Sequence, residues 1–220
     1  KCLHAYTIKE AIGDGAVLGF KIQGMGFQRS TLEDLACKLQ IMNEEELEAA
    51  SDKDLEAAVV KAYAEQTGKN IYDDDRHRME VIDYIVNRSA AKLWLDAPTG
   101  EAFEGLLTVN CIQEAQHYYK LFKQFVADGR VKEDIRKLLP DFPKIAITYT
   151  VGENEDGATA NQHEMAESLA DYNAMFGTSW DLSTLGAYNT DLNERLARKK
   201  SKYRDRSQQL DLVIVVDRLL

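Results

Sequence analysis

The segment Leu210–Leu220, L-D-L-V-I-V-V-D-R-L-L, decides the fold class of this chain. Five of the six residues from Leu212 to Asp217 are apolar, four of them β-branched, with no polar–apolar alternation. Such a run is typical of a strand buried on both faces, as in a parallel sheet with helices on each side. The working groups of an open α/β sheet lie at the carboxyl ends of its strands, yet this sequence stops there. Because it also starts at Lys1 and not at a Met, we expect a fragment of a larger protein.

Strands and helices alternate along the sequence before this terminal strand. Short apolar runs predict two earlier strands, and apolar residues at helical spacing predict three helices between the strands. The predicted strands are Gly105–Val109 and Lys144–Thr150, and the predicted helices run from Asn110 to near Gly129, over Glu164–Phe176 and over Thr190–Tyr203. In the first of these helices, Asn110 and Gln113 are spaced as a capping box. In the last, Leu192, Leu196 and Tyr203 are expected to point inward and the basic side chains outward.

The first half of the chain has a mainly helical pattern. After a helical turn at Thr7–Ile12 and a strand at Val17–Ile22, residues 32–95 predict helices that include Asp54–Gln66 and Arg76–Leu95. We therefore predict an α/β fold with a parallel sheet flanked by helices, since strands joined by such helices pair in parallel. The predicted units are a junction segment with one strand (1–31), a helical insertion (32–100) and the sheet-bearing domain (101–220).

Composition limits the classes of protein to which the chain could belong. No apolar run approaches the roughly 20 residues of a membrane span, so no membrane partner is expected. The three cysteines are widely spaced and odd in number, which favours reduced thiols and a cytoplasmic protein over a disulfide framework. The net charge of −10 argues against a stand-alone nucleic-acid module, which is usually basic.

The charge is unevenly distributed along the chain. Residues 33–56 carry nine acidic side chains against two lysines, and residues 195–206 carry seven basic side chains against one aspartate. The acidic region is either a partner surface or a solvated helical face, and the second reading is favoured. The basic run could neutralise nucleic-acid phosphates. Its spacing alone favours a solvated face.

Known nucleotide and metal motifs are absent from the sequence. It contains no phosphate loop of the G-x-x-x-x-G-K-[ST] type, no G-x-G-x-x-G after a strand and no H-E-x-x-H. Asp73, Asp74 and Asp75 with His77 could supply oxygen ligands to a metal, but a helix cap explains them better. No catalytic, cofactor-binding or metal-binding residue is therefore predicted within this chain.

The turn Thr108-Val109-Asn110 is the best candidate for a binding site. It lies at the carboxyl end of a predicted strand and opens a helix, where free backbone N–H groups and a hydroxyl suit a phosphate. An ordinary capped helix explains the same residues equally well.

Six stretches of the sequence resemble one family, the restriction (R) subunit of type I restriction–modification enzymes. They occur in the order found in that family and cover well over half of the chain: Leu3–Phe20, Leu106–Lys123, Phe142–Thr150, Asp171–Thr178, Leu182–Lys200 and Leu210–Leu220. Residues 24–71 and 89–102 match the family poorly. The resemblance implies an incomplete second RecA-like lobe of a helicase-type motor, with a helical insertion.

The resemblance also implies the activity and partners of the parent protein. R subunits hydrolyse ATP with Mg²⁺, translocate double-stranded DNA and cleave it, in complexes with modification and specificity subunits. Thr108 and Asn110 occupy the motif that faces the DNA backbone in the second lobe. Lys199 and Lys200 are further DNA-contact candidates on their local charge. The Walker motifs and the nuclease residues are not in this sequence, so the chain alone is expected to bind no ATP or Mg²⁺, to be inactive and to bind DNA weakly.

Two alternatives remain open. The chain could be the second lobe of another superfamily-two helicase or translocase, or an acidic α/β interaction module without nucleotide chemistry.

Overall fold

A computed structural model of the chain describes residues 7–14, 26–89, 104–150 and 158–216. Within these ranges, three parallel strands form one sheet in the order β1-β3-β2, with β1 at Gly105–Val109, β2 at Ile145–Thr148 and β3 at Leu212–Val216. The predicted parallel sheet flanked by helices is thus confirmed. The terminal strand β3 lies in the centre of the sheet, which explains why its sequence is apolar without alternation. The strand predicted at Val17–Ile22 lies outside the described residues.

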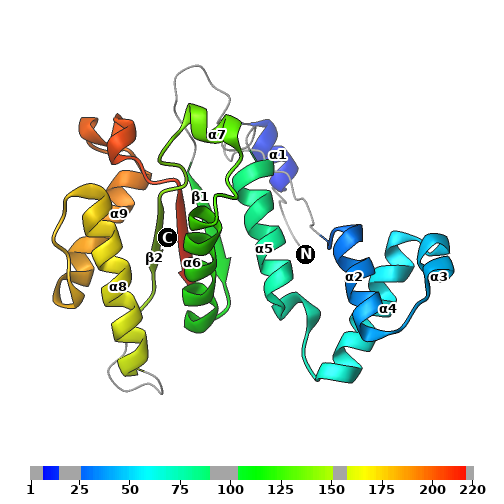
Figure 1. Ribbon diagram of the computed structural model, residues 1–220. Coiled ribbons are helices and arrows are strands. Elements are labelled where there is room, and N and C mark those ends of the chain that lie inside the picture. The colour runs from blue at the N-terminus through cyan, green and yellow to red at the C-terminus, as the bar shows by residue number, and fades with distance from the viewer. Residues whose placement is uncertain (1–6, 15–25, 90–103, 151–157, 217–220) are drawn as a thin grey trace, which may run out of the picture.

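Helices connect the strands as crossovers (Figure 1). Helix α6, Ile112–Ala127, and α7, Glu133–Leu138, join β1 to β2. Helices α8, Ala158–Phe176, and α9, Leu185–Leu196, lie between β2 and β3, followed by short 3-10 turns η4, Ser201–Arg204, and η5, Arg206–Gln208. A further turn, η3, Leu182–Thr184, precedes α9. The predicted bounds of the last helix, Thr190–Tyr203, were therefore wrong at both ends. Helix α9 begins five residues earlier and ends at Leu196.

The helical segment before the sheet contains a small bundle. Its helices are α2, Arg29–Leu39, α3, Glu44–Ala49, and α4, Asp52–Thr67, followed by the turn η1, Ile71–Asp73. Gly68 ends α4 in the left-handed conformation. Helix α5, Asp75–Asp83, continues as a π-turn over Tyr84–Arg88, and α1 spans Ile8–Gly13. Residues 90–95, predicted to be helical, are not among the described ones.

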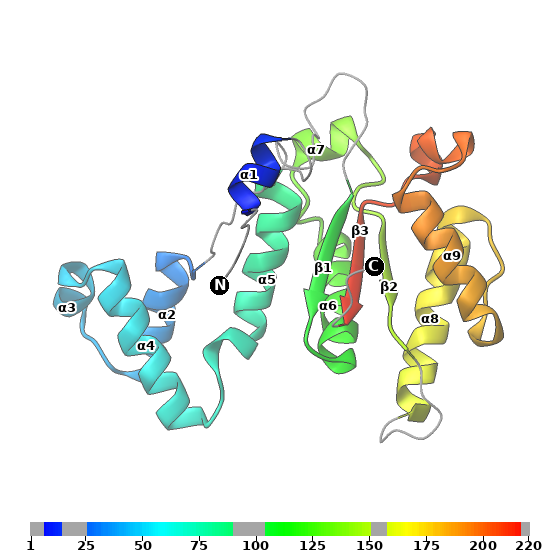
Figure 2. The same cartoon turned by 180° about the vertical axis from the view of Figure 1, so that it is seen from behind.

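Two hydrophobic cores organise the described chain. The smaller one belongs to the bundle and is built from Leu32, Leu35, Ala36, Leu47, Leu55, Val59 and Ile71. The larger one surrounds the sheet and includes Phe122 and Phe125 of α6, both fully buried. It also takes in Ile82 and Val86, so the end of α5 and its π-turn pack with the sheet (Figure 2). The start of α5 contacts the bundle segment, because the His77 ring lies 4.6 Å from Phe27 and 5.2 Å from Tyr72 between ring centroids. The division of the chain at 31/32 and 100/101 remains a prediction.

None of the described helices is both long and apolar enough to cross a membrane. Cys37 and Cys111 are free cysteines, and Cys2 lies outside the described residues.

Candidate functional site

The carboxyl ends of the parallel strands meet at one edge of the sheet, where Thr108 is exposed. The strand register aligns Thr108 with Val215 of β3 and Thr148 of β2, so the three side chains share one face. The Thr148 hydroxyl is buried and donates to Oδ1 of Asn189 on α9 at 2.6 Å. The Thr108 hydroxyl makes no hydrogen bond within the described parts of the chain. It is therefore available to a ligand at this edge.

The turn after Thr108 leaves the start of α6 open. Asn110 is exposed, and Cys111 is the N-cap residue, with φ −152° and ψ 165° and no side-chain cap. The predicted capping box of Asn110 and Gln113 was wrong, because the helix begins one residue later than that pattern requires. The first N–H groups of α6 have no side-chain acceptor within the described residues, and such groups bind anions.

A hydrogen-bonded group fixes the neighbouring elements at the same edge. Nε2 of Gln116 on α6 lies 2.9 Å from the Tyr149 hydroxyl and 3.3 Å from Oδ1 of Asn161 on α8. The Tyr149 hydroxyl donates to the Asn161 carbonyl at 2.9 Å, and burial raises its pKa, so the ring stays neutral. These contacts join α6, the end of β2 and α8. They hold the start of α6 in a fixed position relative to the sheet.

Lys199 and Lys200 lie at the other end of the sheet. Helix α9 begins beside the carboxyl end of β2, where its Asn189 accepts from Thr148, and leads the chain toward the amino end of β3. The residues after α9 therefore lie beside the first residues of the strands (Figure 1). An ion pair of 2.7 Å between Arg198 and Glu104, the residue before β1, fixes this position. Lys199 is exposed, and Lys200 pairs with Glu194 at 2.5 Å. The structure thus brings Thr108 and Asn110 together and separates both from the two lysines by the length of a strand.

Part of the basic run faces inward, which the local sequence pattern did not indicate. Arg195 is only 1% exposed, and its Nε donates to Oδ2 of Asp191 at 2.9 Å. The rings of Tyr172, Phe176 and Tyr203 surround its guanidinium, the closest with its centroid 4.0 Å away. The prediction of an outward basic face was therefore wrong at Arg195, because Asp191 one turn earlier and these three rings accommodate the charge in the core.

A second charged group lies where α5 meets α6. Nε and Nη2 of Arg78 each lie 2.7 Å from an oxygen of Glu114, and Nε2 of His117 lies 2.6 Å from Oδ1 of Asp75. Arg78 is 36 residues from Glu114 in sequence, so no local pattern could have indicated the pair. It joins the helical segment to the first turn of α6.

The aspartate triplet forms a helix start, as predicted. Asp74 is the N-cap of α5 and accepts from the backbone N–H of Arg76. Hydrogen bonds from the Arg76 side chain hold the pKa of Asp74 far below its usual range. Within the described ranges, no group of three or more potential ligand side chains is arranged to hold a metal ion.

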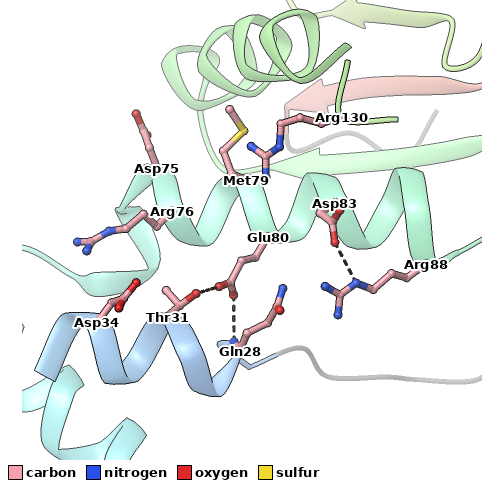
Figure 3. A pocket seen from close by; sticks show the side chains of 10 residues that line it. All are labelled: Gln28, Thr31, Asp34, Asp75, Arg76, Met79, Glu80, Asp83, Arg88 and Arg130. Carbon is pink, nitrogen blue, oxygen red and sulfur yellow. Dashed lines mark hydrogen bonds and ion pairs between the residues drawn. The ribbon is translucent and has the colours of Figure 1, made fainter. Parts of the chain in front are cut away.

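A hollow between α2 and α5 is lined by charged side chains of both signs (Figure 3). Glu80 crosses it from α5 and accepts from the Thr31 hydroxyl and, at 3.1 Å, from the backbone N–H of Gln28. Asp83 and Arg88, which pair at 2.9 Å, lie at one end of the hollow. Asp34 and Arg130 of the lining have no ion pair among the described residues, so the hollow is a polar joint between the bundle and α5 in which only part of the charge is paired.

Comparisons with known proteins agree with one another. The family described as type I restriction enzyme subunit R domain 3 matches residues 101–220. Endonuclease subunits of type I restriction enzymes from Staphylococcus aureus strains COL, MSSA476 and MRSA252 are each 24% identical to this chain over 226 aligned residues. The alignments cover the whole of this chain and 20% of each relative, so it spans about a fifth of their length.

Proposed function

Because the chain belongs to the family of the type I restriction enzyme R subunit domain 3, we propose that it forms part of a DNA-translocating motor in a restriction enzyme. Its parent would be an ATP-dependent site-specific endonuclease that uses Mg²⁺, works in the cytoplasm and assembles with modification and specificity subunits. Within that protein, this chain supplies most of the second RecA-like lobe.

The observation that carries the proposal is the exposed, uncapped turn at the carboxyl edge of the sheet. An exposed hydroxyl at Thr108, an exposed amide at Asn110 and the open N–H groups of α6 offer several donors to one DNA phosphate. The groups that the described residues offer at this edge are hydrogen-bond donors, which suit the binding of a phosphate. We propose that Thr108 and Asn110 contact the DNA backbone.

Lys199 and Lys200 are proposed as a separate DNA contact. They lie at the amino end of the sheet, so one phosphate cannot reach both pairs. The Lys200 ammonium is already paired with Glu194, whereas Lys199 has no ion pair in the described part of the chain. Lys199 is therefore expected to contribute more of the long-range attraction.

DNA-binding measurements on single variants test both contacts. We expect Asn110→Ala to weaken binding of a short DNA duplex by about 1 kcal/mol, the usual net value of one hydrogen bond. The slope of log K against log salt concentration should not change. Lys199→Ala should instead reduce the slope of log K against log salt by about one, because one phosphate neutralisation is lost. Fluorescence anisotropy of a labelled duplex at several salt concentrations measures both quantities.

Matched variants provide the controls. Asn193→Ala removes an exposed amide from α9, and Lys53→Ala removes an exposed ammonium from α4, and neither should change duplex affinity. If Asn110→Ala and Lys199→Ala bind as the unaltered chain does, these residues are ordinary surface groups.

We propose also that the chain alone hydrolyses no ATP. This proposal would be contradicted if the same preparations hydrolysed ATP at a steady-state rate that a substitution within the chain abolishes.

A further inference from the structure

Helix α6 carries a negative charge beside its open turn. Glu114 is the third residue of the helix and lies in its first turn. A carboxylate there interacts favourably with the partial positive charge of the helix start. The same carboxylate would repel a DNA phosphate that approaches the open N–H groups, because like charges a few ångströms apart interact unfavourably even near solvent. A DNA contact at Asn110 is therefore strengthened when this charge is balanced.

Arg78 of α5 balances it. Its Nε and Nη2 bind the two carboxylate oxygens of Glu114 at 2.7 Å each, the two-pronged geometry that makes such pairs strong. Its Nη1 contacts the Asp73 carbonyl and, at 3.1 Å, Oδ1 of Asp75. The hydrogen bonds to Glu114 raise the pKa of Arg78, so it stays charged. With a side chain only 9% exposed and its donors engaged, this guanidinium does not itself reach DNA.

The other charged groups at this contact compensate one another in part. Asp75 faces both Arg78 and His117, and the hydrogen bond from His117 lowers the pKa of Asp75 and keeps it ionised. Asp75 is itself in the first turn of α5, so the positive end of that helix stabilises its charge as well. Among the described residues, Arg78 is the cation that pairs with Glu114.

We propose that Arg78 is a positioning residue for the phosphate contact at Asn110: it neutralises Glu114 and fixes α5 against the first turn of α6. The proposal rests on the proposed function, since it concerns the same turn. It gives the helical segment before the sheet a role in DNA binding, through a residue that touches no DNA.

Three variants separate an electrostatic effect from a structural one. In Arg78→Met the aliphatic stem is kept, and duplex affinity at low salt should fall about two- to fivefold, as expected for one uncompensated charge several ångströms from a phosphate. Glu114→Gln should raise affinity by a similar factor. The double variant should return to within about twofold of the unaltered chain, because the repelling charge is gone. All differences should shrink as salt is added.

Thermal unfolding of each variant shows whether it is folded at the temperature of the binding assay. Arg29→Met serves as the matched control. Arg29 also binds two carboxylates and two carbonyl groups, but on α2 in the bundle, and its loss should leave affinity unchanged. Equal affinity of folded Arg78→Met and the unaltered chain would overturn the proposal. So would a double variant as weak as Arg78→Met, or a Glu114→Gln variant with no gain.

The Asn110→Ala result distinguishes this failure from failure of the proposed function. Weaker binding by Asn110→Ala with unaltered binding by Arg78→Met rejects the role of Arg78 alone. No loss in either variant, or no duplex binding by the unaltered chain, rejects the DNA contact and the role of Arg78 together.

Discussion

Asp191 is a buried carboxylate that three side chains from different elements contact. Burial alone would raise its pKa, but hydrogen bonds from Arg195, Tyr203 and Tyr172 outweigh that effect and lower the pKa. The carboxylate thus joins α8, α9 and η4 at one point. Its charge is needed because Arg195 has no solvent to screen it.

This arrangement predicts a pH-dependent loss of stability. Because the folded-state pKa of Asp191 is lowered, its contribution is present above the unfolded-state value of about 3.9 and is lost as pH falls through the folded-state value. Asp191→Asn should lower the free energy of unfolding at pH 7 by about 3 kcal/mol, since it leaves a buried arginine unpaired. The difference from the unaltered protein should narrow below about pH 4, as measured by denaturant unfolding.

An exposed aspartate provides the comparison for Asp191. Asp128→Asn should change the free energy of unfolding by less than about 0.5 kcal/mol at either pH. If the free energies of unfolding of Asp191→Asn and the unaltered protein differed by the same amount from pH 7 to pH 3, the ionised carboxylate would not be what stabilises Arg195.

At the level of elements, α8 and α9 each contain or border on a glycine, but the two glycines differ in backbone conformation. Gly177 ends α8 with φ +66°, and its N–H donates to the Asn173 carbonyl at 2.8 Å. Gly186 lies in the first turn of α9 without a positive φ. A Cβ at either position would meet no atom within 4 Å. Only backbone conformation therefore distinguishes the two sites.

The same substitution should consequently have opposite effects at these glycines. Gly177→Ala should destabilise the protein by about 1 kcal/mol, because L-residues are strained in the left-handed region. Gly186→Ala should stabilise it by about 0.5 kcal/mol, because alanine has the higher helix propensity. Paired thermal unfolding curves measure both, and equal signs would show that packing and not backbone conformation decides.

For the molecule as a whole, the two cores imply two cooperative units. The bundle core is separate from the sheet core. The described contacts between the bundle segment and α5 include the hydrogen bonds from Gln28 and Thr31 to Glu80 and the ring contacts of His77 with Phe27 and Tyr72, all at partly exposed side chains. Regions joined by few buried contacts open independently in native-state exchange. The bundle is therefore expected to open without the sheet.

Leu55→Ala tests this separation. Leu55 is fully buried in the bundle core, so its truncation should cost about 2–5 kcal/mol there. Amide exchange should accelerate in α2 and α4 while the amides of β3 keep their protection. The counterpart Leu169→Ala, in the sheet core, should accelerate exchange in β3. Uniform acceleration across both units in Leu55→Ala would indicate a single cooperative core.

The sequence by itself determined the sheet strands, most of the helices, the parallel pairing and the cap at Asp74, because apolar periodicity and turn residues act over a few neighbouring positions. Only the tertiary structure decided where the charges lie. It buried Arg195, joined Arg78 to Glu114 across 36 residues, and set Lys199 and Asn110 at opposite ends of the sheet. The physical reason is that burial and ion pairing depend on groups far apart in the chain, and no local spacing specifies them.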